Sequence, residues 1–307
     1  MSYKYFLYGL NVESEIEIEE AYKQDFDTEP DVRIVIGEVP DQVKELDSYK
    51  NNEFFFATSS NGLVFRIPGT GEYWATKDKI TVKPFEGAAH SYVKCFILGS
   101  SFGYCMLLRK QVVMHGGAVS RYGKGIIVTG ESGAGKSTVT DSLLSDGYQF
   151  IADDVCALTE NDGKSHINMA YPQQKLCRDA ALNKGYDLSE LIYINEDRDK
   201  FALRLKDGYL KDGADFDYLF ELVLSEDDKL SMRKISGHEK LNLLMRNVYR
   251  GVDGFRIWGV PVEYMQMLLK VASTVEIYQI SRPKNLDTLP EIVSFIDEVV
   301  SGKYSAI

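Results

Sequence analysis

The chain has 307 residues, of which 44% are hydrophobic and 26% charged, as in a soluble globular protein with one large domain or two smaller ones. It carries 46 acidic and 35 basic residues, a formal net charge of −11. We therefore predict no nucleic-acid partner, because a general nucleic-acid binder presents a basic face. The four cysteines include no C-x-x-C pair, and Met1–Tyr5 lacks the apolar core of a signal peptide. These features predict a cytoplasmic protein without structural zinc or disulfides.

Residues 1–90 are predicted to form a smaller, β-rich N-terminal domain. Val32–Ile36 is a β-branched run, and an Asn-Gly dipeptide between Glu53–Thr58 and Leu63–Ile67 is typical of a hairpin turn. Further strands are expected at 3–10, 72–76 and 80–82, which together predict a meander or small sandwich. The charges of this region either form a solvated face or bind the substrate.

The second predicted domain, residues 91–307, begins with a helix. The most apolar window, Val93–Leu108, contains Lys94 and is shorter than a membrane span needs. We therefore predict a buried helix from about Ser91 to Lys110, and no membrane partner.

A phosphate-binding pattern is the most specific feature of the chain. Gly130, Gly135, Lys136 and Ser137 match G-x-x-x-x-G-K-[ST], between a strand predicted at 126–128 and a helix predicted at 137–145. Glycines let backbone N–H groups approach a polyphosphate, lysine contacts the β and γ phosphates, and the serine hydroxyl can bind Mg²⁺. The alternative is a glycine-rich turn without a ligand. The predicted nucleotide-binding residues are Gly130, Glu131, Ser132, Gly133, Ala134, Gly135, Lys136, Ser137 and Thr138.

Two carboxylates, Asp153 and Asp154, end the next predicted strand, Tyr148–Ala152. Neighbouring side chains of a strand point to opposite faces, so we expect the two to differ in role. One would hold the metal shell and the other would accept a proton from an incoming hydroxyl. We predict Ser137 and Asp154 as metal ligands, and leave open which aspartate is the base. A polar turn at a strand end is the alternative.

A third strand, predicted at 112–119, contains His115 and is joined by a tight turn to the strand before the loop. Taken alone, a histidine such as His115 is more often a hydrogen-bonded structural residue than a catalytic one.

The run from His115 to Val119, the loop 130–137, Gly147 and Ala152-Asp153-Asp154 together resemble the catalytic core of the HPr kinase/phosphorylase family. That family shares its phosphate-loop architecture with ATP-dependent phosphoenolpyruvate carboxykinase. The resemblance implies an α/β fold with a P-loop core of this type, in which Lys136 and Ser137 bind ATP and Mg²⁺. It also implies that Asp153 and Asp154 supply the base and the metal-shell carboxylate, and that His115 assists phosphoryl transfer.

The family's downstream signature segment has no counterpart here. Residues 170–180 instead resemble a segment of HPr-kinase-related proteins, some of which belong to peptide-modification pathways and include kinases of lasso-peptide precursors. The resemblance therefore implies a peptide or small protein as the acceptor, and it leaves open whether that acceptor is HPr or a precursor peptide.

Four basic residues downstream are candidate contacts with the phosphoryl group or an acidic substrate. Lys175 and Arg178 would lie three apart on a helix predicted at Gln173–Leu182. Lys200 precedes a predicted strand at 201–205, and Arg204 lies within it. For all four, a solvated surface position is the alternative.

The remaining pattern predicts alternating strands and helices. Tyr218–Leu224 and Leu230–Ile235 are expected to pair with one another. Helices are expected after Ser236 and Thr288, each with a capping box, and after Pro261, with a strand at 275–280 before the last helix.

These observations predict a kinase that transfers the γ-phosphoryl group of ATP to a serine hydroxyl of a peptide or small protein. ATP and that acceptor are the expected partners, and a homo-oligomer is left open. The alternatives are a small-molecule kinase such as a free-serine kinase, a carboxykinase-like enzyme acting on a small acid, and a non-catalytic ATP-binding regulator.

Overall fold

The computed structural model describes residues 2–40, 44–45, 55–59, 61–183, 185–194 and 199–304. The chain divides into two compact units: unit 1 consists of Met1–Gln111 and Leu176–Leu203, and unit 2 consists of Val112–Lys175 and Arg204–Ile307. Unit 1 extends past the predicted boundary at residue 90, because the helical segment that follows packs on its sheet.

Unit 1 contains a nine-stranded sheet with the order β3-β1-β2-β4-β9-β8-β7-β6-β5. Strands β6 to β9 follow one another as antiparallel neighbours, whereas β4 lies parallel to both β2 and β9. The β1–β2 hairpin turns at Tyr8 and Gly9, which both have positive φ, the conformation that the strand twist favours. The strands are β1 (Tyr3–Leu7), β2 (Leu10–Ser14), β3 (Tyr22–Lys23), β4 (Val32–Ile36), β5 (Lys44–Glu45), β6 (Phe55–Ser59), β7 (Gly62–Ile67), β8 (Gly71–Ala75) and β9 (Lys79–Pro84).

The helical segment of unit 1 is continuous from His90 to Leu108, as α1 (His90–Phe96), the π-helical turn η2 (Ile97–Ser101) and α2 (Phe102–Leu108). By length and composition it is the one described helix that could cross a membrane, so the expectation that it is too short was wrong. The expected burial is confirmed, since 72% of its most apolar window lies inside the structure.

Unit 2 contains a seven-stranded sheet with the order β11-β10-β12-β13-β17-β19-β18. An additional parallel pairing of β11 with β17 closes five of these strands into a ring. The β10–β11 turn at Tyr122-Gly123 and the β12–β13 turn at Asp162-Gly163 both have positive φ at two residues, as predicted for tight hairpins. The strands are β10 (Val113–Arg121), β11 (Lys124–Gly130), β12 (Gln149–Asn161), β13 (Lys164–Ile167), β17 (Ala214–Ser225), β18 (Ser231–Ile235) and β19 (Glu276–Pro283).

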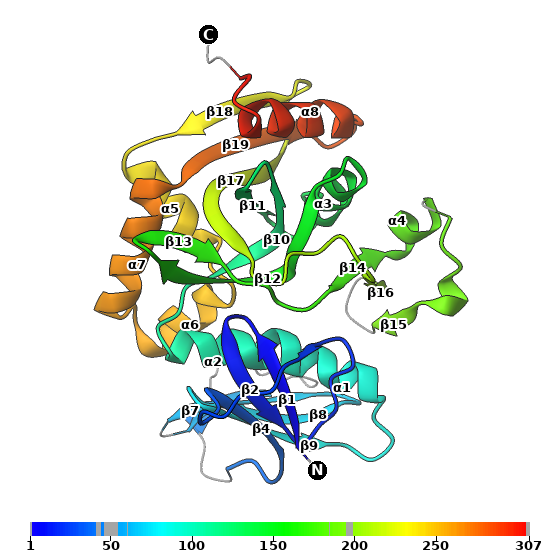
Figure 1. Cartoon of the computed structure of the whole chain (residues 1–307), viewed down its shortest axis with the longest axis vertical. Coiled ribbons are helices and arrows are strands. Elements are labelled where there is room, and N and C mark those ends of the chain that lie inside the picture. The colour runs from blue at the N-terminus through cyan, green and yellow to red at the C-terminus, as the bar shows by residue number, and fades with distance from the viewer. Residues whose placement is uncertain are drawn as a thin grey trace. The chain divides into compact units, whose positions relative to one another are not determined.

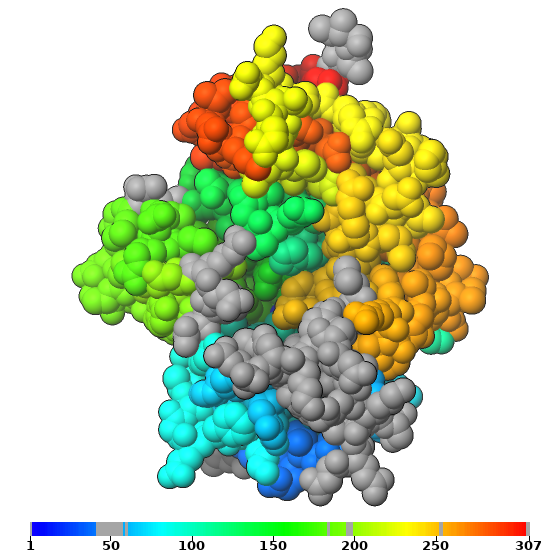
Figure 2. All heavy atoms as spheres, turned by 180° about the vertical axis from the view of Figure 1, so that it is seen from behind, coloured from blue at the N-terminus to red at the C-terminus, as the bar shows by residue number. Residues whose placement is uncertain are grey.

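Helices cover this sheet on two sides (Figure 1). On one side α3 and α8 pack against each other, and their apolar residues form one core with β11, β17 and β19. On the other side α5, α6 and α7 form a continuous surface, yellow to orange in Figure 2. These helices are α3 (Lys136–Ser145), α5 (His238–Arg246), α6 (Gly251–Trp258), α7 (Val262–Thr274) and α8 (Leu289–Val300).

The division between the units falls inside β14 (Gln173–Cys177) and β16 (Lys200–Arg204), which form a three-stranded sheet with β15 (Ile192–Ile194). A short helix, α4 (Arg178–Asn183), and a 3-10 turn, η3 (Leu188–Glu190), complete unit 1.

Three local predictions were wrong. The segment from Gln173 is a strand before it becomes helical at Arg178. Strands β17 and β18 do not pair with each other, because β19 lies between them. Neither capping box forms: Gly237 and Thr288 occupy the N-cap positions of α5 and α8, and no side chain caps either helix.

Candidate active site

The glycine-rich loop, residues 130–137, connects β11 to α3. Gly130, Gly133 and Gly135 all have positive φ (139°, 90° and 102°), which side-chained residues rarely adopt. Gly135 is the N-cap of α3 and no side chain caps the helix, so its first N–H groups face outward beside a positive helix end. Lys136 Nζ donates to the carbonyls of Gly130 (2.8 Å) and Glu131 (3.1 Å) and is thereby held over the loop. This geometry suits an anionic ligand.

The register of the sheet brings the aspartate pair level with this loop. Gly116 on β10 is paired with Thr129 on one side and with Asp154 on the other. Asp154 therefore lies two strands from the residue that precedes Gly130, a lateral separation of about 10 Å. The prediction that the aspartates end a strand was wrong, because β12 continues beyond them to Asn161, but they lie level with the end of β11.

Gly117 explains how α3 can lie so close to β10. An added Cβ at this position would be 2.4 Å from Thr140 Oγ1 of α3, closer than real Cβ contacts. Gly117 is also paired directly with Asp153 on β12. The glycine therefore sets the distance between the helix that follows the loop and the strand that carries the carboxylates.

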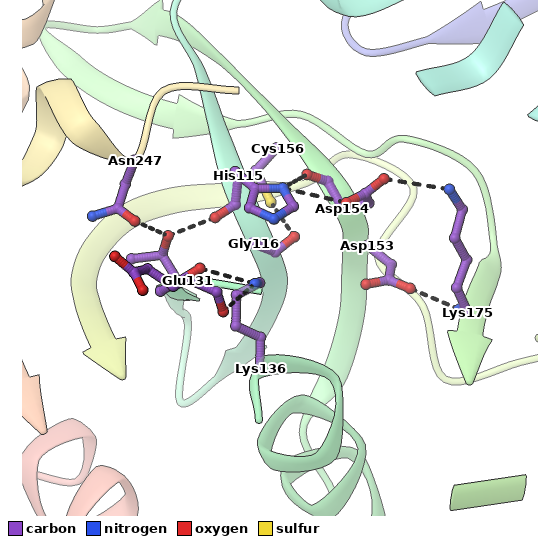
Figure 3. A network of polar contacts seen from close by, with 11 residues as sticks. His115, Gly116, Glu131, Lys136, Asp153, Asp154, Cys156, Lys175 and Asn247 are labelled. Atoms are coloured by element: carbon purple, nitrogen blue, oxygen red, sulfur yellow. Dashed lines mark hydrogen bonds and ion pairs between the residues drawn. The ribbon is translucent and has the colours of Figure 1, made fainter. Parts of the chain in front are cut away.

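Asp154 is the more open of the two aspartates. Its φ of +71° is unusual for a side-chained residue and interrupts the regular alternation of side chains along β12. Its Oδ1 lies 3.3 Å from His115 Nδ1 and its Oδ2 lies 3.3 Å from Lys175 Nζ (Figure 3). The Asp154 side chain is 22% exposed and that of Lys175 only 5%, so a cation already faces this carboxylate from inside the protein.

Asp153 has a different environment. It is 8% exposed, and its Oδ2 accepts a hydrogen bond of 2.7 Å from the backbone N–H of Lys175. The two aspartates thus hold the same residue of β14, one through its backbone and the other through its ammonium group. The contacts of the two aspartates therefore differ, and a difference in their roles stays a prediction.

Behind His115 lies a buried polar network that the sequence reading missed. Glu221 on β17 is 3% exposed and accepts hydrogen bonds from Arg246 Nε (2.8 Å), Asn247 Nδ2 (2.7 Å) and Gln279 Nε2 (2.7 Å). Burial opposes ionisation of this carboxyl, but these donors outweigh it and lower its pKa below the ordinary value. Glu221 is therefore an ionised carboxylate within the sheet.

Asn247 carries this network to His115, which lies between Asn247 and Asp154 in Figure 3. The His115 N–H donates to Asn247 O (2.8 Å), and Thr129 Oγ1 hydrogen-bonds His115 O (2.5 Å) and Asn247 Oδ1 (2.9 Å). Both backbone groups of His115 are thus fixed. The signal that could have revealed the network is the single carboxylate inside the apolar run Tyr218–Leu224, since an unpaired buried charge would be costly.

The other predicted basic residues are placed as follows. Arg178 pairs with Asp199 at the surface of unit 1 and lies 5.0 Å from the centre of the Phe201 ring. Lys200 begins β16, and Arg204 ends it with an exposed side chain. Lys175 makes an ion pair with Asp154, and the roles of all four residues stay predictions.

Residues 107–176 match the family model of the HPr serine kinase C-terminal domain. This span contains His115, the glycine-rich loop, both aspartates and Lys175. The chain is related to the HPr kinases. Among curated relatives, the HPr kinase/phosphorylase of Clostridium tetani (strain Massachusetts / E88) is 42% identical over 57 residues, 19% of either chain. That of Mycoplasmopsis pulmonis (strain UAB CTIP) is 30% identical over 122 residues, 38% of either chain.

The HPr-kinase-related match thus spans well under half the length of these relatives. A solved HPr(Ser) kinase/phosphatase from Coxiella burnetii covers 62% of this chain and 98% of its own, at 14% identity and a TM-score of 0.31. The α/β description of this chain rests on its own mixed sheet and covering helices.

The residues of this HPr-kinase-related core fit a nucleotide-bound Mg²⁺ better than a protein-caged metal. Among the described residues there is no group of three or more His, Cys, Asp or Glu side chains that could hold a metal. Mg²⁺ commonly takes one or two protein oxygens and completes its shell with phosphates and water. Ser137, half-buried at the start of α3, and Asp154 could supply those oxygens.

Proposed function

We propose that this protein is an ATP-dependent kinase that transfers the γ-phosphoryl group to a hydroxyl, with a serine of a peptide or small protein as the acceptor. The observation that carries the proposal is the register of the sheet. Gly116 pairs with Asp154 on one side and on the other with Thr129, which precedes the glycine-rich loop. The match of residues 107–176 to the HPr serine kinase C-terminal domain supports it.

In the proposed reaction, the loop N–H groups and Lys136 hold the phosphates and stabilise charge on the equatorial oxygens. Ser137 and Asp154 would hold a Mg²⁺, whose chemistry there would be to neutralise phosphate charge. The acceptor oxygen forms a bond to the γ-phosphorus, the bond from that phosphorus to the β–γ bridging oxygen breaks, and ADP leaves. The hydroxyl proton passes to an aspartate.

We assign Asp153 as the base that accepts this proton. One of its oxygens is held by the Lys175 N–H, which fixes the orientation of the carboxylate. Asp154, between His115 and the ammonium group of Lys175, is assigned to the metal shell. His115, whose backbone is fixed by Asn247 and Thr129, orients Asp154.

The peptide acceptor is supported by the resemblance of residues 170–180 to HPr-kinase-related proteins of peptide modification. Labelled ATP offered with HPr, a serine-containing peptide, free serine and a small dicarboxylic acid would separate the acceptor classes. Transfer to peptide or protein serine is expected. Transfer to free serine or to the acid alone would replace this proposal by the small-molecule or carboxykinase-like alternative, and ATP binding without any transfer would support a regulator.

Site variants test the residue roles. Lys136→Ala should abolish transfer and weaken ATP binding, because it removes the charge held over the loop. Asp153→Asn and Asp154→Asn should keep ATP affinity within a few-fold and lower turnover by at least about 100-fold. Full phosphorylation rates in both asparagine variants would refute the assignment of the pair.

A further inference from the structure

An arginine from a strand outside the matched domain lies against the glycine-rich loop. Arg282 is near the end of β19, which runs parallel to β17, and β17 runs parallel to β11. Arg282 is paired with Leu224, two residues beyond the level of Gly130. Its Nη1 donates to the carbonyl of Ala134 (3.2 Å), and a Cβ on Gly135 would be only 2.6 Å from that nitrogen. The guanidinium therefore lies on the turn of the loop where α3 begins.

Arg282 has no carboxylate partner among the described residues. Three other arginines of unit 2 have a carboxylate partner: Arg121 pairs with Asp297, Arg233 with Glu239 and Arg246 with Glu221. Among the described residues none offers Arg282 a carboxylate within ion-pair distance, and its buried Nε has no hydrogen-bond partner. In a chain of net charge −11, this half-buried guanidinium has the Ala134 carbonyl as its hydrogen-bond partner among the described residues.

Sheet order places this guanidinium and the aspartates on opposite sides of the loop. From β11, the aspartates on β12 are two strands away through β10, and Arg282 on β19 is two strands away through β17. A polyphosphate lying across the loop, with its transferred end toward the aspartates, has its other end toward Arg282. The planar fork of donors on a guanidinium suits phosphate oxygens.

We propose that Arg282 binds the non-transferred phosphates of the nucleotide. This inference rests on the proposed function, because it takes the loop ligand to be ATP with its γ phosphate at the aspartates. A contact with phosphates that ADP retains already acts in the ground state, where it holds the nucleotide before transfer. It therefore lowers KM, and it changes kcat less than a contact with the transferring group does. A contact with the transferring group would act on kcat instead.

The test compares Arg282→Gln and Arg282→Lys with the wild type by calorimetric titration with ADP, ATP and inorganic pyrophosphate. Arg282→Gln keeps an amide that can donate to Ala134 O but removes the charge, whereas Arg282→Lys keeps the charge without the planar fork. Arg256→Gln, an exposed arginine on α6, is the charge-matched control. Thermal melting without nucleotide shows that each variant is folded.

Arg282→Gln should raise the dissociation constants of ADP, ATP and pyrophosphate alike, by about 10- to 100-fold. Arg282→Lys should recover part of this loss, and Arg256→Gln should match the wild type. In Arg282→Gln, KM for ATP should rise, whereas kcat should stay within about two-fold of the wild-type value. Unchanged affinities in Arg282→Gln, or a decrease confined to kcat, would overturn the inference. So would a lower affinity for ADP and ATP with an unchanged affinity for pyrophosphate, because that pattern indicates a contact with the nucleoside. A wild type that binds no ATP would overturn the proposed function itself.

Discussion

Replacing Gly117 by alanine should separate α3 from the strand that faces the aspartates. The added Cβ would be 2.4 Å from Thr140 Oγ1 and 3.0 Å from its Cγ2, whereas ordinary contact begins at 3.4 Å. The helix or the strand must therefore move by about 1 Å. A misplacement of that size at an active site can cost about 100-fold in rate, and overpacking a tight core costs about 1–3 kcal/mol.

The assay is phosphoryl transfer from labelled ATP, with ATP affinity and thermal stability measured on the same samples. We expect kcat of Gly117→Ala to fall by about 10- to 100-fold, while ATP affinity changes less because the loop itself is intact. Thr140→Ala alone should be mild, since Thr140 Oγ1 is buried and has no hydrogen-bond partner among the described residues.

The double variant Gly117→Ala/Thr140→Ala supplies the matched control. It removes both atoms that approach closest and leaves the Thr140 Cβ position at 3.1 Å, so a substantial part of the lost rate should return. A single variant as active and stable as the wild type would refute the reasoning. So would a double variant no better than the single one.

Two further predictions concern the groups around the aspartates. Glu221→Gln should lower the free energy of unfolding by about 2 kcal/mol at pH 7, measured by urea denaturation. Because the pKa of Glu221 is lowered in the folded state, its contribution is present above the ordinary carboxyl pKa and disappears as the pH falls through the folded value. The two proteins should therefore converge only as the pH falls below the folded pKa, which lies under the ordinary carboxyl value, and a stability difference that does not shrink with falling pH would contradict the ionised network. Lys175→Met should lower transfer by more than about 10-fold, since it removes the buried cation facing Asp154. Arg178→Gln, whose native partner is Asp199 at the surface, should not change the rate, and the opposite ranking would assign the substrate contact to Arg178.

Much of the site could be predicted because its residues are local in sequence. The loop and the aspartates lie within 25 residues of one another, between strands whose apolar runs and turn dipeptides are distinctive. The tight turn predicted between the strand at 112–119 and the strand before the loop formed at Tyr122-Gly123. Local signals of this kind do not depend on tertiary pairing.

The rest depends on long-range contacts that a single sequence does not reveal. Strands β17 and β18 are adjacent in the chain, and their sequence pattern therefore predicts a hairpin. In the structure β19 lies between them. Residues 173–177 have a weak helical pattern, and the sequence therefore predicts a helix there. They form strand β14 instead, because the backbone and the side chain of Lys175 are held by the aspartates of β12. Arg282 approaches the loop from almost 150 residues away, with no motif to mark it.

The most direct measurement is a crystal structure with Mg²⁺ and a non-hydrolysable ATP analogue. The account predicts a metal within about 2.1 Å of Ser137 Oγ, and a γ-phosphorus no more than about 5 Å from a carboxylate oxygen of Asp153 or Asp154. A triphosphate seated on the loop with its γ-phosphorus more than about 10 Å from both carboxylates, the full two-strand separation, would contradict it.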